Sequence, residues 1–143
     1  MPEPILLTGR ILRTLASPFD TAPEDALRIE TDWGLVVERG KIADIGPSAQ
    51  LRAAWPQTTE IAYGNDLICP GFVDAHVHFP QTAIIASWGK RLIDWLNTYT
   101  FPEEMRFGDP DYAAEIAARY LDLTAANGTT TVCSFCTIHT ASV

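Results

Sequence analysis

Short apolar runs alternate with turn residues over the first 66 positions of the chain. The runs lie at residues 5–7, 11–12, 26–29 and 35–37. This pattern is typical of short strands. Residues 36–42 contain Gly40, which readily adopts the positive φ of a tight turn, so we expect a hairpin there. Residues 48–55 are expected to form a short helix that Pro56 ends. The pattern therefore predicts a β-rich first domain.

The pattern changes near residues 63–66, which are the best candidate for a domain boundary. Residues 67–78 are apolar at nearly every second position, and the alternating face becomes polar toward the end. This pattern indicates a buried strand with a polar tip. We therefore expect one domain over residues 1–66 and a second over residues 67–143.

Residues 109–128 carry the clearest helix signal in the chain. Asp109 suits the N-cap, Pro110 the first helical position and Gly128 the position after the last turn. Apolar side chains recur at helical spacing at Tyr112, Ile116, Tyr120 and Leu123. We expect them to form one stripe that packs inward on a sheet.

Residues 128–136 follow this helix without a linker and are β-branched or aromatic at most positions, which favours a second strand. A strand, a helix and another strand form a βαβ unit, so the predicted fold class is α/β. Parallel strands of this kind are buried on both faces, and functional groups gather at their carboxyl ends.

Composition narrows the possible partners and compartment. The chain has 143 residues, of which 47% are hydrophobic, enough to form a core. Acidic residues outnumber basic ones by 18 to 10, and the net charge of -8 disfavours nucleic acid and membrane surfaces as partners. The chain shows no secretory signal and no apolar run near the ~18 residues of a membrane span. The three cysteines, an odd number, suit a reducing compartment, so we expect a cytoplasmic protein.

Two histidines at the end of the first predicted strand are the candidate metal ligands. His76 and His78 are two residues apart, which on a strand places both imidazoles on one face, about 6.5 to 7 Å apart along the chain. At this spacing both can reach one ion. Asp74 shares their face and is placed to orient an imidazole or to support the strand end. The alternative is one hydrogen-bonded core histidine and one solvated histidine.

Residues 70–78, Pro-Gly-Phe-Val-Asp-Ala-His-Val-His, strongly resemble the first-strand signature of the amidohydrolase superfamily. The resemblance implies that His76 and His78 bind zinc, together with two further histidines and an aspartate from later strands. It also implies a (β/α)8 TIM-like barrel flanked by a small β-sandwich, to which residues 1–66 would contribute strands.

Residues 79–81, 92–104 and 127–131 are in addition similar to the guanine deaminase family. That resemblance implies a homodimer that hydrolyses guanine to xanthine and ammonia, with Gln81 bound to the purine. The amide of Gln81 offers a donor and an acceptor, which matches a purine edge that has both. The alternative for Gln81 is a solvated loop amide.

Other candidate residues have structural interpretations. The helical spacing of Leu92, Trp95, Leu96 and Tyr99 indicates packing. The alternative to packing is that Trp88 or Phe101 forms an apolar wall or a stacking face for a bound purine. Cys133 and Cys136 are three apart on a strand, so their thiols should diverge and pack rather than bind metal. A structural role is expected for His139.

The length of the chain limits the function expected of it. A full barrel takes roughly 250 residues, and this chain has the length for about two of its eight strands. We therefore expect an N-terminal fragment of a longer enzyme, inactive alone, with its catalytic acids and remaining ligands beyond residue 143. The alternatives are another amidohydrolase that acts on a purine, pyrimidine or triazine, and a non-catalytic binding or oligomerisation module.

Overall fold

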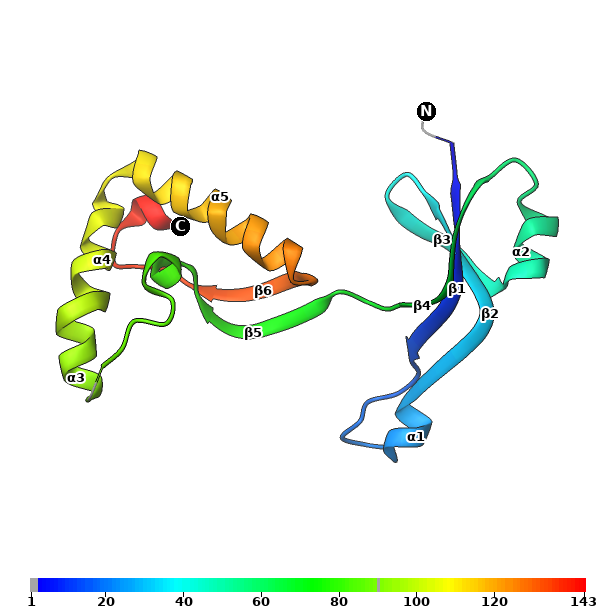
Figure 1. The fold of residues 1–143 in the computed structure, drawn as a ribbon, viewed down its shortest axis with the longest axis horizontal. Coiled ribbons are helices and arrows are strands. Elements are labelled where there is room, and N and C mark those ends of the chain that lie inside the picture. The colour runs from blue at the N-terminus through cyan, green and yellow to red at the C-terminus, as the bar shows by residue number, and fades with distance from the viewer. Residues whose placement is uncertain (1–2, 90) are drawn as a thin grey trace. The chain divides into compact units, whose positions relative to one another are not determined.

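The computed structural model describes residues 3–89 and 91–143, which fold as two compact units (Figure 1). The N-terminal unit ends at Pro70 and the C-terminal unit begins at Gly71. Within the described residues, no helix combines the length and the apolar character needed to cross a membrane.

The N-terminal unit is a four-stranded sheet in the order β3-β2-β1-β4, with two short helices. Its elements are β1 (Ile5–Thr14), α1 (Pro23–Ala26), β2 (Leu27–Glu38), β3 (Lys41–Pro47), α2 (Ser48–Ala54) and β4 (Thr59–Ile68). β2 pairs antiparallel with both β1 and β3, whereas β4 pairs parallel with β1. The prediction of a β-rich first region is confirmed.

The local predictions for this unit are also confirmed. Arg39 and Gly40 connect β2 to β3 with φ of 54° and 73°, the positive values that a two-residue hairpin turn requires. Helix α2 ends at Ala54, two residues before Pro56. The core of the unit is formed by Leu6, Val36 and Leu51, so α2 covers the sheet through Leu51.

The C-terminal unit is built around two parallel strands and one long helix. Its elements are β5 (Phe72–His78), η1 (Phe79–Ile84), α3 (Leu92–Trp95), the π-helix η2 (Leu96–Thr100), α4 (Phe101–Met105), η3 (Arg106–Gly108), α5 (Pro110–Ala126), β6 (Thr129–Phe135) and η4 (Thr140–Ser142). The predicted α/β class and the βαβ unit formed by β5, α5 and β6 are confirmed.

Helix α5 begins and ends where its capping residues predict. The Asp109 carboxylate accepts a hydrogen bond of 3.0 Å from the backbone N–H of Asp111. Gly128, with φ of 79°, follows the C-cap residue Asn127. Glycine suits this position because a side chain is strained at positive φ. Both ends of the helix therefore coincide with the capping residues that the sequence offers.

The core of the C-terminal unit lies between α5 and the short helices that precede it. The buried residues are Phe79, Phe107, Ala113, Ile116 and Tyr120. Ile116 and Tyr120 were expected on the packed stripe, but Leu123 is 45% exposed. The predicted stripe is therefore correct in its centre and wrong at its C-terminal end.

Two details of the predicted strand over residues 67–78 are wrong. Leu67 and Ile68 belong to β4, where they pair with β1, and β5 begins only at Phe72. Pro70 lies between the strands and has no N–H to donate to a ladder. The start of β5 is also not buried, since Phe72 and Val73 are 62% and 68% exposed. The units accordingly divide between residues 70 and 71, later than the boundary expected at residue 66.

Candidate active site

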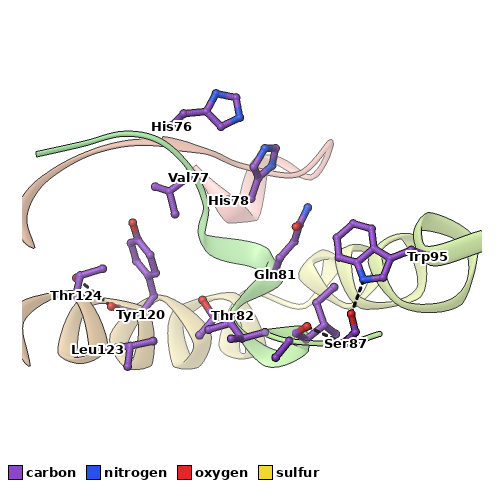
Figure 2. Close-up of a pocket in the computed structure, with 13 residues that line it drawn as sticks. His76, Val77, His78, Gln81, Thr82, Ser87, Trp95, Tyr120, Leu123 and Thr124 are labelled. Atoms are coloured by element: carbon purple, nitrogen blue, oxygen red, sulfur yellow. Dashed lines mark hydrogen bonds between the residues drawn. The ribbon is translucent and has the colours of Figure 1, made fainter. Parts of the chain in front are cut away.

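A cavity of about 440 Å³ lies at the carboxyl end of β5. Its walls come from β5, η1, α3, α5 and the segment that joins η1 to α3 (Figure 2). The lining residues are His76, Val77, His78, Gln81, Thr82, Ile84, Ile85, Ala86, Ser87, Trp95, Tyr120, Leu123 and Thr124. The volume lies within the range of roughly 300–1,000 Å³ typical of small-molecule sites.

The structure brings His76 and His78 together as their spacing predicts. Their ring centroids are 5.4 Å apart, and Figure 2 shows both rings on one side of β5 and Val77 on the other. Phe135 of β6 lies 5.0 Å from the ring of His76 and 4.9 Å from that of His78. His76 is exposed and His78 half-buried, so neither is the buried core histidine of the alternative interpretation.

Asp74 supports the backbone of the strand rather than an imidazole. Its carboxylate accepts a hydrogen bond of 3.2 Å from the backbone N–H of His76. The pairing register of β5 with β6 shifts between Asp74 and Val77. The carboxylate therefore binds the backbone at the irregular part of the strand, which is the second of the two roles expected for it.

Gln81 lies on η1, directly after the two histidines. Its Nε2 donates a hydrogen bond of 3.2 Å to Oε1 of Glu104 on α4. The Gln81 side chain is half-buried and hydrogen-bonded, and it lines the cavity. It is therefore not the solvated loop amide of the alternative interpretation. Whether the amide binds a purine stays a prediction.

Trp95 lines the cavity together with Tyr120, and its Nε1 donates to the carbonyl oxygen of Ser87 at 3.2 Å. The candidates Trp88 and Phe101 do not line it, and they are 72% and 48% exposed. Helical spacing grouped Trp95 with packing residues, and no signal in the pattern separated it from them. The packing prediction is wrong for Leu92, which is 72% exposed.

Glu103 and Glu104 are consecutive on α4 but have different partners. Glu103 is buried, and its carboxylate accepts hydrogen bonds from the Tyr112 hydroxyl and, at 3.0 Å, from Nη1 of Arg106. Burial, followed by the bond to Glu103, raises the pKa of Tyr112 to about 12. The Arg106 guanidinium also lies 3.8 Å from the centre of the Tyr112 ring. Glu103 therefore fastens α4 to α5, and the sequence pattern did not indicate this network.

Tyr120 is a further lining residue that the sequence assigned only to packing. Its hydroxyl oxygen is buried and has no hydrogen-bond partner within the described part of the chain. Burial, and next the charge of Asp74, raises the pKa of this phenol. Tyr120 belongs to the core of the C-terminal unit, and its hydroxyl is covered beside the cavity.

The remaining candidate residues lie outside the cavity. Cys133 and Cys136 are both exposed, so the prediction that they pack is wrong. The backbone N–H of His139 donates to Oγ1 of Thr137 at 3.1 Å. Its ring packs beside Gly108, where a Cβ atom would lie 3.5 Å from Cε1 of the imidazole. Both contacts agree with a structural role. Within residues 3–89 and 91–143, no three His, Cys, Asp or Glu side chains are grouped to hold a metal ion.

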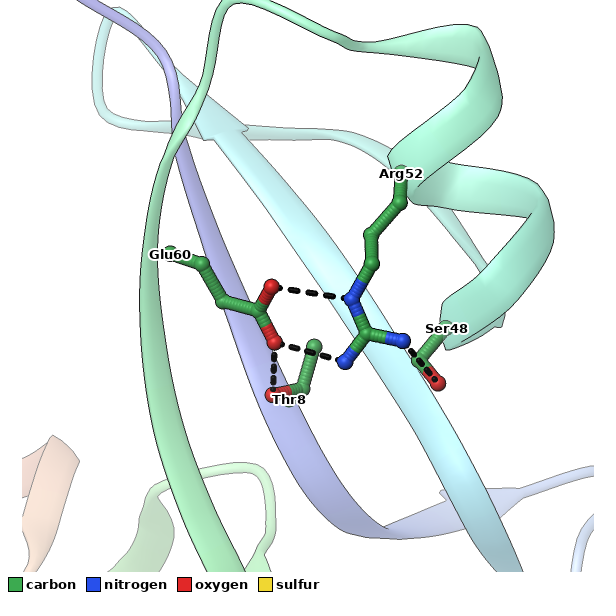
Figure 3. Close-up of polar contacts among 4 residues, drawn as sticks. All are labelled: Thr8, Ser48, Arg52 and Glu60. Atoms are coloured by element: carbon green, nitrogen blue, oxygen red, sulfur yellow. Dashed lines mark hydrogen bonds and ion pairs between the residues drawn. The ribbon is translucent and has the colours of Figure 1, made fainter.

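A second polar cluster, in the N-terminal unit, is closed on itself (Figure 3). Glu60 of β4 accepts hydrogen bonds of 2.8 Å from Thr8 of β1 and of 2.9 and 2.8 Å from Arg52 of α2. The bonds from Arg52 and then Thr8 lower the pKa of Glu60 to about 2. Arg52 also reaches Ser48 at 3.4 Å. The polar groups of this cluster thus bind one another, which is the mark of a structural network.

Two family models match parts of the chain. Residues 67–141, more than half of the chain, match the Amidohydrolase family, and residues 34–57 match an imidazolonepropionase-like composite domain of bacteria. Guanine deaminase of Escherichia coli K12 is 38% identical over 134 residues, which are 93% of this chain and 30% of that protein. The chain therefore spans about 30% of the length of such relatives.

Solved structures give the same result. Guanine deaminase from Bradyrhizobium japonicum superposes with a TM-score of 0.89 at 31% identity, over 99% of this chain and 31% of that one. Guanine deaminase from C. acetobutylicum, solved with guanine in its active site, superposes with a TM-score of 0.78 at 33% identity, over 98% of this chain and 32% of that one. Together with the family match over β5, α5 and β6, these similarities show that the chain belongs to the amidohydrolase family.

Proposed function

We propose that this chain is part of a zinc-dependent enzyme that hydrolyses guanine to xanthine and ammonia, as in purine catabolism. The observation that carries the proposal is the cavity at the end of β5, where two neighbouring imidazoles and a bonded amide line one space. Relatives that are guanine deaminases, one of them solved with bound guanine, support the choice of substrate.

The proposed architecture is a (β/α)8 barrel of which β5 and β6 are the first two strands. The support is physical: parallel strands are normally covered on both faces, yet Phe72, Val73 and Phe135 are 62%, 68% and 49% exposed. Further strands and helices would cover these side chains. The sheet of the N-terminal unit would form part of the accompanying β-sandwich.

His76 and His78 fit a zinc site as two of its ligands. Both rings lie on one side of a strand end with centroids 5.4 Å apart, and imidazole nitrogen is a preferred zinc ligand. A catalytic zinc takes three or more protein ligands. Because the described residues contain no group of three His, Cys, Asp or Glu side chains, the remaining ligands must come from elsewhere in the enzyme. A bound zinc ion would act as a Lewis acid and activate water at neutral pH.

The other lining residues would bind and orient the purine. The Gln81 amide would hydrogen-bond the ring edge, and the indole of Trp95 would form an apolar wall. One water molecule is consumed in the reaction, the bond between the ring carbon and its amino group breaks, and ammonia leaves. We assign the proton transfers to acids beyond residue 143, and we propose a cytoplasmic homodimer.

The proposal is tested with the protein expressed from its own gene, by metal analysis and by ammonia release from guanine. We expect stoichiometric zinc rather than iron, and a loss of activity of at least about 100-fold with His76→Ala or His78→Ala, because a metal ligand is removed. His139→Ala removes a third imidazole that lies outside the cavity, and this variant should keep its metal.

Three outcomes would contradict the proposal. The metal site is wrong if His139→Ala loses the metal while His76→Ala retains it. The substrate is wrong if guanine releases no ammonia but adenine, cytosine or an aminotriazine does. A folded protein that deaminates none of these compounds would be the non-catalytic module.

A further inference from the structure

We propose that Glu104 is a positioning residue, which orients the Gln81 amide so that its carbonyl oxygen accepts a hydrogen bond from the substrate. The inference rests on the proposed function, because it concerns the same cavity. Its structural basis is the hydrogen bond of 3.2 Å from Nε2 of Gln81 to Oε1 of Glu104.

The chemistry of the two groups determines which way the amide faces. A glutamine amide has an oxygen and an NH2 of similar size, so by itself it can turn over and exchange them. An ionised carboxylate accepts hydrogen bonds and donates none. Glu104 therefore binds the NH2 of Gln81, and the carbonyl oxygen, on the other side of the planar amide, is directed away from Glu104.

The backbones that carry the two side chains are both held in place. Beside Gln81, the backbone N–H of Phe79 donates to Ser134 at 3.2 Å, and Thr82 Oγ1 donates to the carbonyl oxygen of Phe79 at 2.6 Å. Beside Glu104, the buried Glu103 binds Tyr112 of α5. With both backbones held, the bond between the side chains restricts the remaining torsions of Gln81.

A restricted acceptor affects which substrates bind well. Guanine has N–H groups on the edge that includes its 2-amino group, whereas adenine has ring-nitrogen lone pairs there and would face the Gln81 oxygen acceptor to acceptor. A site that requires a hydrogen bond rejects a ligand that cannot form it, because its own polar group is then left unpaired. Glu104 thus contributes to selectivity without touching the substrate.

The direct test is the NMR signal of the Gln81 side-chain NH2 in 15N-labelled protein, assigned by its loss in Gln81→Ala. Glu104→Gln keeps the shape of residue 104 but lets the pair bond in either direction. We expect this variant to shift or broaden the Gln81 signal. Glu115→Gln makes the same chemical change on an exposed residue of α5 that pairs with Arg119, and it should leave the signal unchanged.

The kinetic test separates positioning from a loss of structure. We expect Glu104→Gln to raise KM for guanine by about two- to ten-fold with a smaller change in kcat, since one ground-state hydrogen bond is weakened and the competent orientation is less populated. The affinity of this variant for guanine relative to adenine should fall by a similar factor. A merely structural role of Glu104 would instead lower kcat and the melting temperature together.

The two proposals fail in different ways. If the unaltered protein deaminates guanine but Glu104→Gln changes neither KM nor the Gln81 signal, Glu104 does not position the amide. If the unaltered protein does not act on guanine, the proposed function is wrong, and the NMR comparison alone decides whether Glu104 orients Gln81.

Discussion

The Glu60 cluster of the N-terminal unit and the histidine pair of the C-terminal unit differ in what surrounds their polar groups. In the N-terminal unit, the Glu60 carboxylate is bound by Thr8 and Arg52, which ties β4 to β1 and α2 (Figure 3). In the C-terminal unit, His76 and His78 lie at an open cavity (Figure 2). Paired polar groups stabilise a fold, whereas groups directed into a cavity are available to a ligand.

The cores of the units differ in a related way. In the N-terminal unit the buried residues Leu6 and Val36 belong to strands and Leu51 of α2 packs with them, so most of this core comes from the sheet. In the C-terminal unit the buried residues belong to helices, and β5 carries polar side chains on one face. We therefore expect stability to depend on strands in the first unit and on helices in the second.

The largest effect is expected from Phe107→Ala in the C-terminal unit. Phe107 is fully buried and packs edge-on against Phe79 and Tyr112, with ring centroids 5.6 and 5.3 Å away. The cavity left behind should lower the free energy of unfolding by about 3–5 kcal/mol, measured by urea denaturation. Phe19→Ala, at a residue that is 96% exposed, is the control and should cost about 0.5 kcal/mol or less. A loss below about 1 kcal/mol for Phe107→Ala would show that the helical core is not what stabilises this unit.

Leu6→Ala is the corresponding change in the N-terminal unit. Leu6 is 1% exposed and should cost about 2–4 kcal/mol when truncated, with faster hydrogen exchange of the β1 and β2 amides. Leu27→Ala, at a residue that is 48% exposed, should have a much smaller effect. Equal losses for the two leucines would contradict a core centred on the sheet.

Asp109→Ala tests whether the ends of α5 depend on local contacts. Removing the N-cap carboxylate leaves the N–H of Asp111 unpaired and should cost about 1 kcal/mol in thermal or urea unfolding. Asp109→Asn retains a side-chain oxygen that can accept the same hydrogen bond, so most of the stability should return. If asparagine and alanine are equally destabilising, the capping bond is not the cause.

Glu60→Gln has the smallest expected effect, up to about 1 kcal/mol, because the ion pair is partly exposed to water. The pKa of Glu60 is lowered from its ordinary 4.5 to about 2 in the folded protein. Its contribution is therefore complete above about pH 4.5 and is lost as the pH falls toward about 2. Urea unfolding of both proteins across this range should show the difference between them disappearing in acid. A difference that persists at pH 2 would rule out the carboxylate as its source.

Features that depend on a few neighbouring residues were predicted well. The turn at Gly40, the N-cap at Asp109 and the shared face of His76 and His78 each follow from local backbone geometry or from one local hydrogen bond. The resemblance of residues 70–78 to the amidohydrolases agrees with the family match over residues 67–141.

Features that depend on exposure were predicted less well. The alternating pattern of residues 67–78 indicated one buried strand, but Pro70 interrupts the ladder and the start of β5 is exposed. Cys133 and Leu92 were expected to pack and are exposed. Burial of an apolar side chain is favourable, but whether the side chain is covered depends on the elements that pack beside it.

The order of residues along the chain was enough to place two imidazoles on one face of a strand end, because side chains alternate on any strand regardless of its surroundings. The contacts around them came from the tertiary structure alone. Gln81 and Glu104 are 23 residues apart, and the pattern showed neither their hydrogen bond nor the position of Trp95 at the cavity. Such contacts depend on how the helices pack against their neighbours. The local sequence determines that a helix forms, but it does not determine the direction of that helix relative to the other elements.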